Sequence, residues 1–149
     1  VLSDKGSPFL KSIIINKGSK HSVNLGMVAM DKKYLVGKVV EVNYLSSRVL
    51  LLSDLNSKIP VTVEPNGLLS ILSGTGKDYG IIQYSKKYED IKGKSIIYTS
   101  GTSGLFKAGI PIGKINNNLL NDKKKVKFFS DFSQLKFVKI FAFTKNGAE

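Results

Sequence analysis

The sequence predicts an all-β fold, and three features of the chain support this prediction. Short runs of β-branched and aromatic residues alternate with clusters of Gly, Asn, Asp and Ser, which is the pattern of strands separated by turns. No stretch repeats apolar residues at the period of an amphipathic helix for long enough to predict one. The runs are short and regularly spaced, which is typical of a barrel or a sandwich.

The predicted strands fall into two series. The first occupies residues 12–15, 27–30, 34–42, 47–54 and 59–64, and the second occupies residues 68–74, 79–85, 95–101, 110–115, 126–129 and 137–143. Just before the last strand, Ser130 or Asp131 is expected to cap a single helical turn. We therefore expect a first lobe over residues 1–65 and a second over 66–149. The sequence leaves open whether the final strand, within residues 135–145, returns to the first lobe.

The two series contain a short internal echo. LVGKVVEV (35–42) and IPIGKI (110–115) each carry a glycine inside a strand, followed by lysine and a β-branched residue. Glycine weakens a strand, so Gly37 and Gly113 are expected to mark a bulge, a barrel corner or a close backbone approach. Runs such as RVLLL and FVKIFAF are apolar on both faces, so both faces must be covered, either by packing of one lobe against the other or by a partner protein over an exposed face.

Composition excludes several kinds of site. The chain has 149 residues, of which 42% are hydrophobic, as in an ordinary globular protein. It contains no cysteine and one histidine, His21, so we expect neither a metal centre nor a cofactor. No apolar run is long enough to cross a bilayer and no signal sequence follows Val1, so any membrane anchor is expected outside this chain.

The net charge of +12 suggests an anionic partner. Nearly all of the 23 basic residues are lysines spread along the chain, and Arg48 alone offers the guanidinium fork that phosphate and guanine recognition favour. The densest run, Lys123 to Lys125, is expected to be a solvated turn, and contact with an anionic surface such as lipid headgroups or a cell-wall polymer is the alternative for it. The net charge alone supports the alternative function, a basic nucleic-acid-binding β-barrel. Absence of DNA or RNA binding at low salt would exclude it.

No catalytic centre can be assembled from the sequence. The segment TSGTSGLFKAG (99–109) has the spacing of neither a Walker phosphate loop nor a G-x-S-x-G nucleophile elbow, so its glycines are expected to form a tight reversal. His21 and Ser103 lack any spacing that supports a serine-protease triad. The adjacent acids Glu89 and Asp90 are expected to be solvated rather than paired for acid–base chemistry.

Taken in order, the motifs resemble the family of the rod shape-determining protein MreC, a bacterial cell-shape scaffold. The resemblance runs from about Ile13 to Phe143. It is carried by four segments: INKGSKHSVNLGMVAMDKKYLVGKVVEVNYLSSRVLLLSD (15–54), NSKIPVTV (56–63), DIKGKSIIYTSGTSGLFKAGIPIGKI (90–115) and SDFSQLKFVKIF (130–141). Lys94 and Lys107 depart from the family's usual Asp and Pro, which affects the expected shape of local turns.

The resemblance implies two small six-stranded β-barrels packed together as in chymotrypsin-like proteases, without a catalytic site. The residues that match the family's structural motif are Gly26, Gly37, Gly101, Gly104, Gly109, Pro111 and Gly113. Within the same block, the apolar side chains of Leu105, Phe106 and Ile110 are expected to dock a partner protein.

The function implied by the resemblance is a non-enzymatic scaffold of the peptidoglycan-synthesising elongation machinery, the elongasome. The expected location is the extracytoplasmic, periplasmic face of the bacterial inner membrane, where the full-length protein has a single-pass N-terminal anchor. The expected partners are a class B penicillin-binding protein that it regulates, MreD, MreB through the anchor, and further copies of the same protein. Nucleic acid is not an expected partner.

Overall fold

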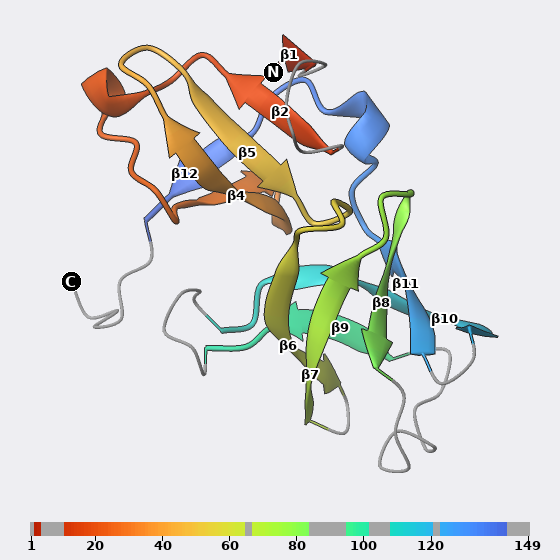
Figure 1. The fold of residues 1–149 in the computed structure, drawn as a ribbon. Helices are drawn as coiled ribbons and strands as arrows, with labels where there is room; N and C mark the ends of the chain where they lie inside the picture. The colour runs from red at the N-terminus through yellow and green to blue at the C-terminus, as the bar shows by residue number, and fades with distance from the viewer. Residues whose placement is uncertain are drawn as a thin grey trace.

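The computed structural model describes residues 2–3, 11–64, 67–83, 95–101, 108–120 and 123–142. Its strands form a six-stranded sheet, in the order β1-β2-β5-β4-β3-β12, and a closed barrel, in the order β10-β11-β8-β7-β6-β9 (Figure 1). The elements are β1 Leu2–Ser3, β2 Ser12–Ile15, η1 Ser19–His21, β3 Val28–Asp31, β4 Tyr34–Val42, β5 Ser47–Leu51, β6 Lys58–Glu64, β7 Leu68–Gly74, β8 Tyr79–Gln83, β9 Ile96–Thr99, β10 Pro111–Leu120, β11 Lys123–Phe128, η3 Phe132–Gln134 and β12 Lys139–Phe141. The predicted all-β fold is confirmed.

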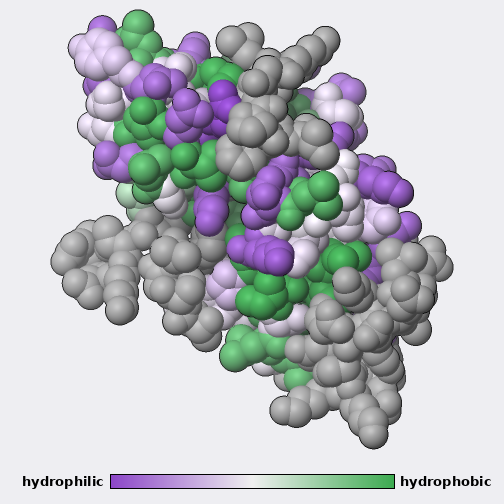
Figure 2. Space-filling model, viewed as in Figure 1, coloured by the Kyte–Doolittle hydropathy of each residue, from purple (hydrophilic) through white to green (hydrophobic). Residues whose placement is uncertain are grey.

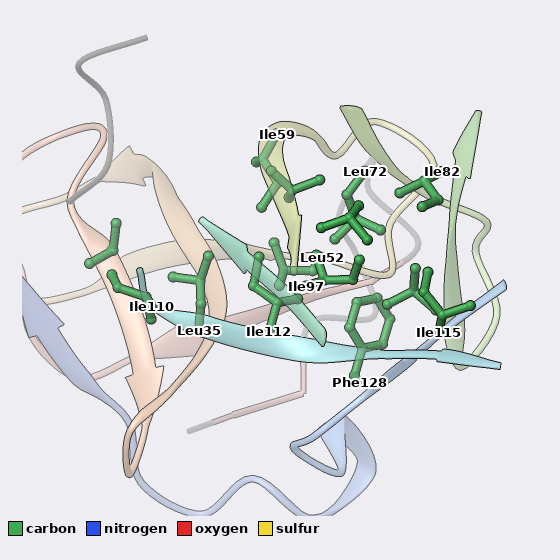
Figure 3. Packing of buried hydrophobic residues seen from close by; sticks show 14 residues of the cluster. Leu35, Leu52, Ile59, Leu72, Ile82, Ile97, Ile110, Ile112, Ile115 and Phe128 are labelled. Carbon is green, nitrogen blue, oxygen red and sulfur yellow. The ribbon is translucent and has the colours of Figure 1, made fainter. Parts of the chain in front are cut away.

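Alternating side chains fill the closed barrel. Val61 and Val63 on β6 point inward and are almost completely buried, as is Leu72 on β7. Strand side chains alternate between the two faces of a sheet, so every second residue of each strand enters the core. Figure 3 shows this core, to which β8, β9, β10 and β11 add the side chains of Ile82, Ile97, Ile112, Ile115, Val126 and Phe128.

From here on, the first lobe is the six-stranded sheet and the second lobe is the closed barrel, and the two differ in how their strands pair. Its sheet has β1 at one edge and β12 at the other, and the described residues contain no pairing between these two strands. Among the described strands, only those of the second lobe close a barrel. The prediction of two closed barrels therefore has structural support in the second lobe alone.

The sheets also divide the chain differently from the predicted boundary after residue 65. Strand β6, placed in the first lobe by that boundary, pairs with β7 and β9 in the closed barrel. Strand β12 pairs with β3, so the end of the chain joins the first sheet (Figure 1). Propensity identifies a strand but not the neighbour with which it pairs, which is why the sequence pattern placed β6 in the wrong sheet.

The two lobes share an apolar core. Leu35 and Val36 are neighbours on β4 whose side chains take opposite faces of the first sheet. Val36 packs into the core of the first lobe, whereas Leu35 belongs to the barrel cluster that contains Ile110 and Ile112. Figure 3 shows Leu35 between Ile110 and Ile112. Phe132 of η3 packs against both clusters, so the return of the chain also joins the lobes.

A buried carboxylate fixes the connection between the lobes. Asp54 lies between β5 and β6 and is fully buried. Its Oδ2 accepts a hydrogen bond of 2.7 Å from the backbone N–H of Lys11, and its Oδ1 accepts one of 2.7 Å from the N–H of Asn56. These charge-assisted bonds join the start of β2 to the connecting segment.

Gly37 and Gly113 occupy equivalent places in the two lobes. The register of β4 against β3 shifts just before Gly37, and the register of β10 against β9 shifts between Pro111 and Gly113. A Cβ on Gly37 would overlap the carbonyl oxygen of Leu50, and one on Gly113 would overlap that of Lys127. The predicted bulge and close backbone approach are both present at each glycine.

Two local predictions have opposite outcomes. The helical turn before the last strand is present as η3, and Asp131 is its cap, because Oδ1 accepts the Ser133 N–H at 3.0 Å. The run Lys123 to Lys125, predicted as a solvated turn, is instead the start of β11, and Lys124 is only 9% exposed. Pairing of β11 with β8 and β10 on both sides outweighs the charge of the run.

We predict that Gly37→Ala and Gly113→Ala each lower the free energy of unfolding by about 1–3 kcal/mol, because the added methyl group meets backbone that cannot move independently. Gly101→Ala is the matched control. A Cβ there would meet the side chain of Ala108, at 3.2 Å, and the site is exposed. Urea unfolding of the three variants measures the difference, and equal losses in all three would contradict this account.

Candidate partner-binding surfaces

The glycines of the matched motif have different structural roles. Gly26 and Gly109 adopt positive φ values of 86° and 87° in exposed turns, a conformation that other residues rarely adopt. Gly101 is exposed beside Ala108, and Pro111 begins β10. Gly104 lies outside the described residues. None of the described motif residues carries a chemically reactive group, so their contribution is to backbone shape.

The structure describes one of the three apolar residues predicted to dock a partner. Leu105 and Phe106 lie outside the described residues. Ile110 is 6% exposed, because its side chain packs in the barrel core. Its backbone N–H donates to Thr99 Oγ1 at 2.9 Å, and its carbonyl accepts from the Thr99 N–H at 2.9 Å. Ile110 therefore closes the base of the hairpin between β9 and β10 and does not itself form an exposed surface.

A different apolar surface lies on the outside of the barrel, on β7. Leu69 and Ile71 are 58% and 49% exposed, although both are large aliphatic residues. They pair with Thr62 and Pro60 of β6, and Thr62 in turn pairs with Tyr98 of β9. We call these five residues the β7 face. Figure 2 shows hydrophobic side chains gathered over this part of the barrel.

The β7 face is a surface that the sequence reasoning missed. Residues Leu68 and Leu72 of the same strand pack into or against the barrel core, so β7 is apolar on both of its faces. The segment LLSILSG carried this signal, because apolar residues occupy both alternating sets of positions. Inside a closed barrel only one of these sets can be buried, and the other remains available to a partner.

Exposed apolar residues also occur on the first lobe, but they are dispersed. Tyr44 and Leu45 lie in the turn between β4 and β5, and Leu25 precedes Gly26 in another turn. Phe137 is 85% exposed in the segment that leads into β12. Single exposed apolar residues are normal for a folded protein, so these positions provide controls rather than a second surface.

The described residues contain no arrangement that suggests catalysis or metal binding. His21 is exposed in η1, and its Nδ1 accepts the Gly18 N–H at 3.1 Å, which gives the ring a local structural role. Ser103, the other residue considered for a triad, lies outside the described residues. Within the described part of the chain, no group of three His, Cys, Asp or Glu side chains is placed to hold a metal ion.

Residues 1–142 match the family described as "Rod shape-determining protein MreC, barrel core". The chain is 32% identical over 140 residues to the cell shape-determining protein MreC of Cereibacter sphaeroides, covering 94% of this chain and 46% of the relative. It is 31% identical over 125 residues to the protein of the same name from Escherichia coli, covering 83% of this chain and 34% of the relative. The chain thus spans less than half the length of these relatives.

Solved structures agree with this match. A crystal structure of MreC from Pseudomonas aeruginosa superposes with a TM-score of 0.85 at 28% identity, and covers 95% of each chain. A complex between penicillin-binding protein PBP2 and MreC from Helicobacter pylori matches with a TM-score of 0.65 at 17% identity, over 87% of this chain and 82% of that one. The second likeness is one of fold.

No helix in the described residues is both long and apolar enough to cross a membrane.

Three observations point to the same family. They are the order of motifs along the chain, the closed barrel beside a second sheet, and the match of the family model over residues 1–142. The chain belongs to the family of the rod shape-determining protein MreC.

Proposed function

We propose that this chain is the part of a bacterial cell-shape scaffold that binds a penicillin-binding protein through the β7 face. The observation that carries the proposal is the exposure of Leu69 and Ile71 side by side on one strand of the barrel. A contiguous apolar surface is unfavourable in water unless a partner covers it. Support for the class of partner comes from the H. pylori relative, which has been solved in complex with PBP2.

The role proposed for the chain is non-enzymatic. A scaffold needs a rigid surface rather than reactive side chains, and the residues of the β7 face are aliphatic, aromatic or hydroxyl-bearing. Binding biases a penicillin-binding protein toward activity if the scaffold has a higher affinity for the active conformation. No cofactor and no nucleic acid are part of this proposal.

The wider setting is also proposed. The full-length protein is anchored by a single N-terminal span at the periplasmic face of the inner membrane, in the peptidoglycan-synthesising elongation machinery. Its further partners are MreD, MreB through the anchor, and other copies of itself. Family membership supports this setting. We further propose that the first lobe is completed to a second barrel, as in chymotrypsin-like proteases, and the six strands of its sheet support that arrangement.

The double substitution Leu69→Glu with Ile71→Glu is predicted to weaken binding to the periplasmic part of a class B penicillin-binding protein by tenfold or more, because two carboxylates must then be desolvated at the interface. The matched control is Leu25→Glu with Leu45→Glu, which makes the same chemical change at exposed positions of the first lobe. Calorimetric titration measures both affinities. Equal affinities of the two double variants would contradict docking at the β7 face.

A second substitution tests the loop that follows β9. If Phe106 contributes to docking, as the sequence suggests, Phe106→Asp weakens binding of the same penicillin-binding protein in a pull-down, because the aromatic contact is replaced by a carboxylate. Retention of full binding by Phe106→Asp would remove this loop from consideration and leave the β7 face as the docking site.

A further inference from the structure

A cleft lies at the junction of the two lobes, where the entrance to β2 meets β8, β11 and η3. Its volume is about 850 Å³, within the range of sites that enclose a small ligand or a short peptide. It is lined from the first lobe by Lys11, Leu51 and Ser53, and from the barrel and the segment after it by residues 77–79 and 125–133. The cleft shares no residue with the β7 face.

Four lysines surround the cleft. Lys11, Lys77 and Lys127 are exposed, and among the described residues none of their ammonium groups makes an ion pair. The fourth, Lys125, places its Nζ 4.2 Å from the centre of the Tyr79 ring, which holds this charge over an aromatic wall. Four positively charged residues around one concave surface raise the local potential for an anionic ligand.

The two acidic residues of the cleft offset only part of the charge of the four lysines. Asp131 is occupied as the cap of η3: its Oδ1 accepts the Ser133 hydroxyl at 2.6 Å and the Ser133 N–H at 3.0 Å. The hydroxyl and then the N–H hold the pKa of Asp131 below its usual value, so it is ionised at neutral pH. Asp78 is exposed at the rim. The cleft therefore has a net positive charge and two negative groups, of which Asp131 is held in place by its hydrogen bonds.

The inner part of the cleft combines an apolar wall with an unmet hydrogen bond. Phe128 and Phe132 stack with ring centroids 4.7 Å apart. Ser130 is 8% exposed, and its buried hydroxyl has no hydrogen-bond partner among the described residues. A buried hydroxyl without a partner is unfavourable, and a ligand oxygen that accepts its hydrogen bond would remove this cost.

We propose that this cleft binds an acidic, partly apolar peptide segment of a partner protein. The lysine ammonium groups attract Asp and Glu side chains of the peptide. An apolar side chain of the peptide, placed between these acidic residues, packs against the wall formed by Phe128 and Phe132. The carboxylates of Asp78 and Asp131 oppose a dense polyanion such as a phosphate chain, whereas a peptide can orient its N–H groups toward them. The site is additional to the proposed docking of a penicillin-binding protein and does not depend on it.

The test uses a short fluorescein-labelled peptide in which glutamates alternate with leucine and serine, and fluorescence anisotropy as the readout. Lys77→Glu with Lys127→Glu weakens binding by about tenfold or more, because two attractive contacts become repulsive. Lys17→Glu with Lys20→Glu changes the net charge equally at exposed positions outside the cleft, and weakens binding by less than threefold. Equal losses in both double variants would overturn the proposal.

A second measurement uses the unsubstituted protein, so it does not depend on whether a variant folds. In ¹⁵N-labelled wild-type protein, addition of the peptide is expected to shift the amide signals of Lys77, Tyr79 and Ser130 and to leave those of Leu69 and Ile71 unchanged. Shifts confined to other parts of the chain would overturn the proposal. So would tighter binding of polyphosphate, single-stranded DNA or anionic lipid vesicles than of the peptide, because the cleft would then recognise phosphate.

Discussion

The apolar contact between the two lobes is the interaction on which the rest of the structure depends. The side chain of Leu35 lies on the face of β4 that is turned toward the barrel, where it packs with Ile110 and Ile112. All three side chains are almost completely buried. Burial of a leucine or isoleucine side chain contributes roughly 1.5–3 kcal/mol, so a few such residues account for a stable junction. Phe132 closes the junction from the other side, where η3 carries the chain back to the first sheet.

The two surfaces proposed to bind partners arise in different ways. The cleft lies where Lys11 and the end of β5 in one lobe face β8 and β11 in the other, and the Asp54 carboxylate ties Lys11 to the connection between the lobes. The β7 face is formed in the opposite way, by complete closure of the barrel, which leaves the second apolar set of β7 outside. One surface is thus made by packing between lobes and the other by pairing within one lobe.

Local features could be predicted from the sequence, whereas those that depend on long-range pairing could not. The roles of Gly37 and Gly113 follow from the cost of glycine in a strand, and the Asp131 cap follows from a short-range hydrogen bond. The assignment of β6 to the barrel and the burial of Ile110 depend on strands far away in the chain. The cleft is assembled from four separate parts of the sequence, so no local pattern could reveal it.

The central claim is that the two lobes form one cooperative unit through the Leu35, Ile110 and Ile112 contact. Native-state hydrogen exchange at increasing urea concentration tests it directly, because it reports the opening of each strand separately. We expect the amides of β4 in the first lobe and β10 in the barrel to lose protection together, with the same urea dependence. Exchange of β4 through an opening that leaves β10 protected would contradict the claim.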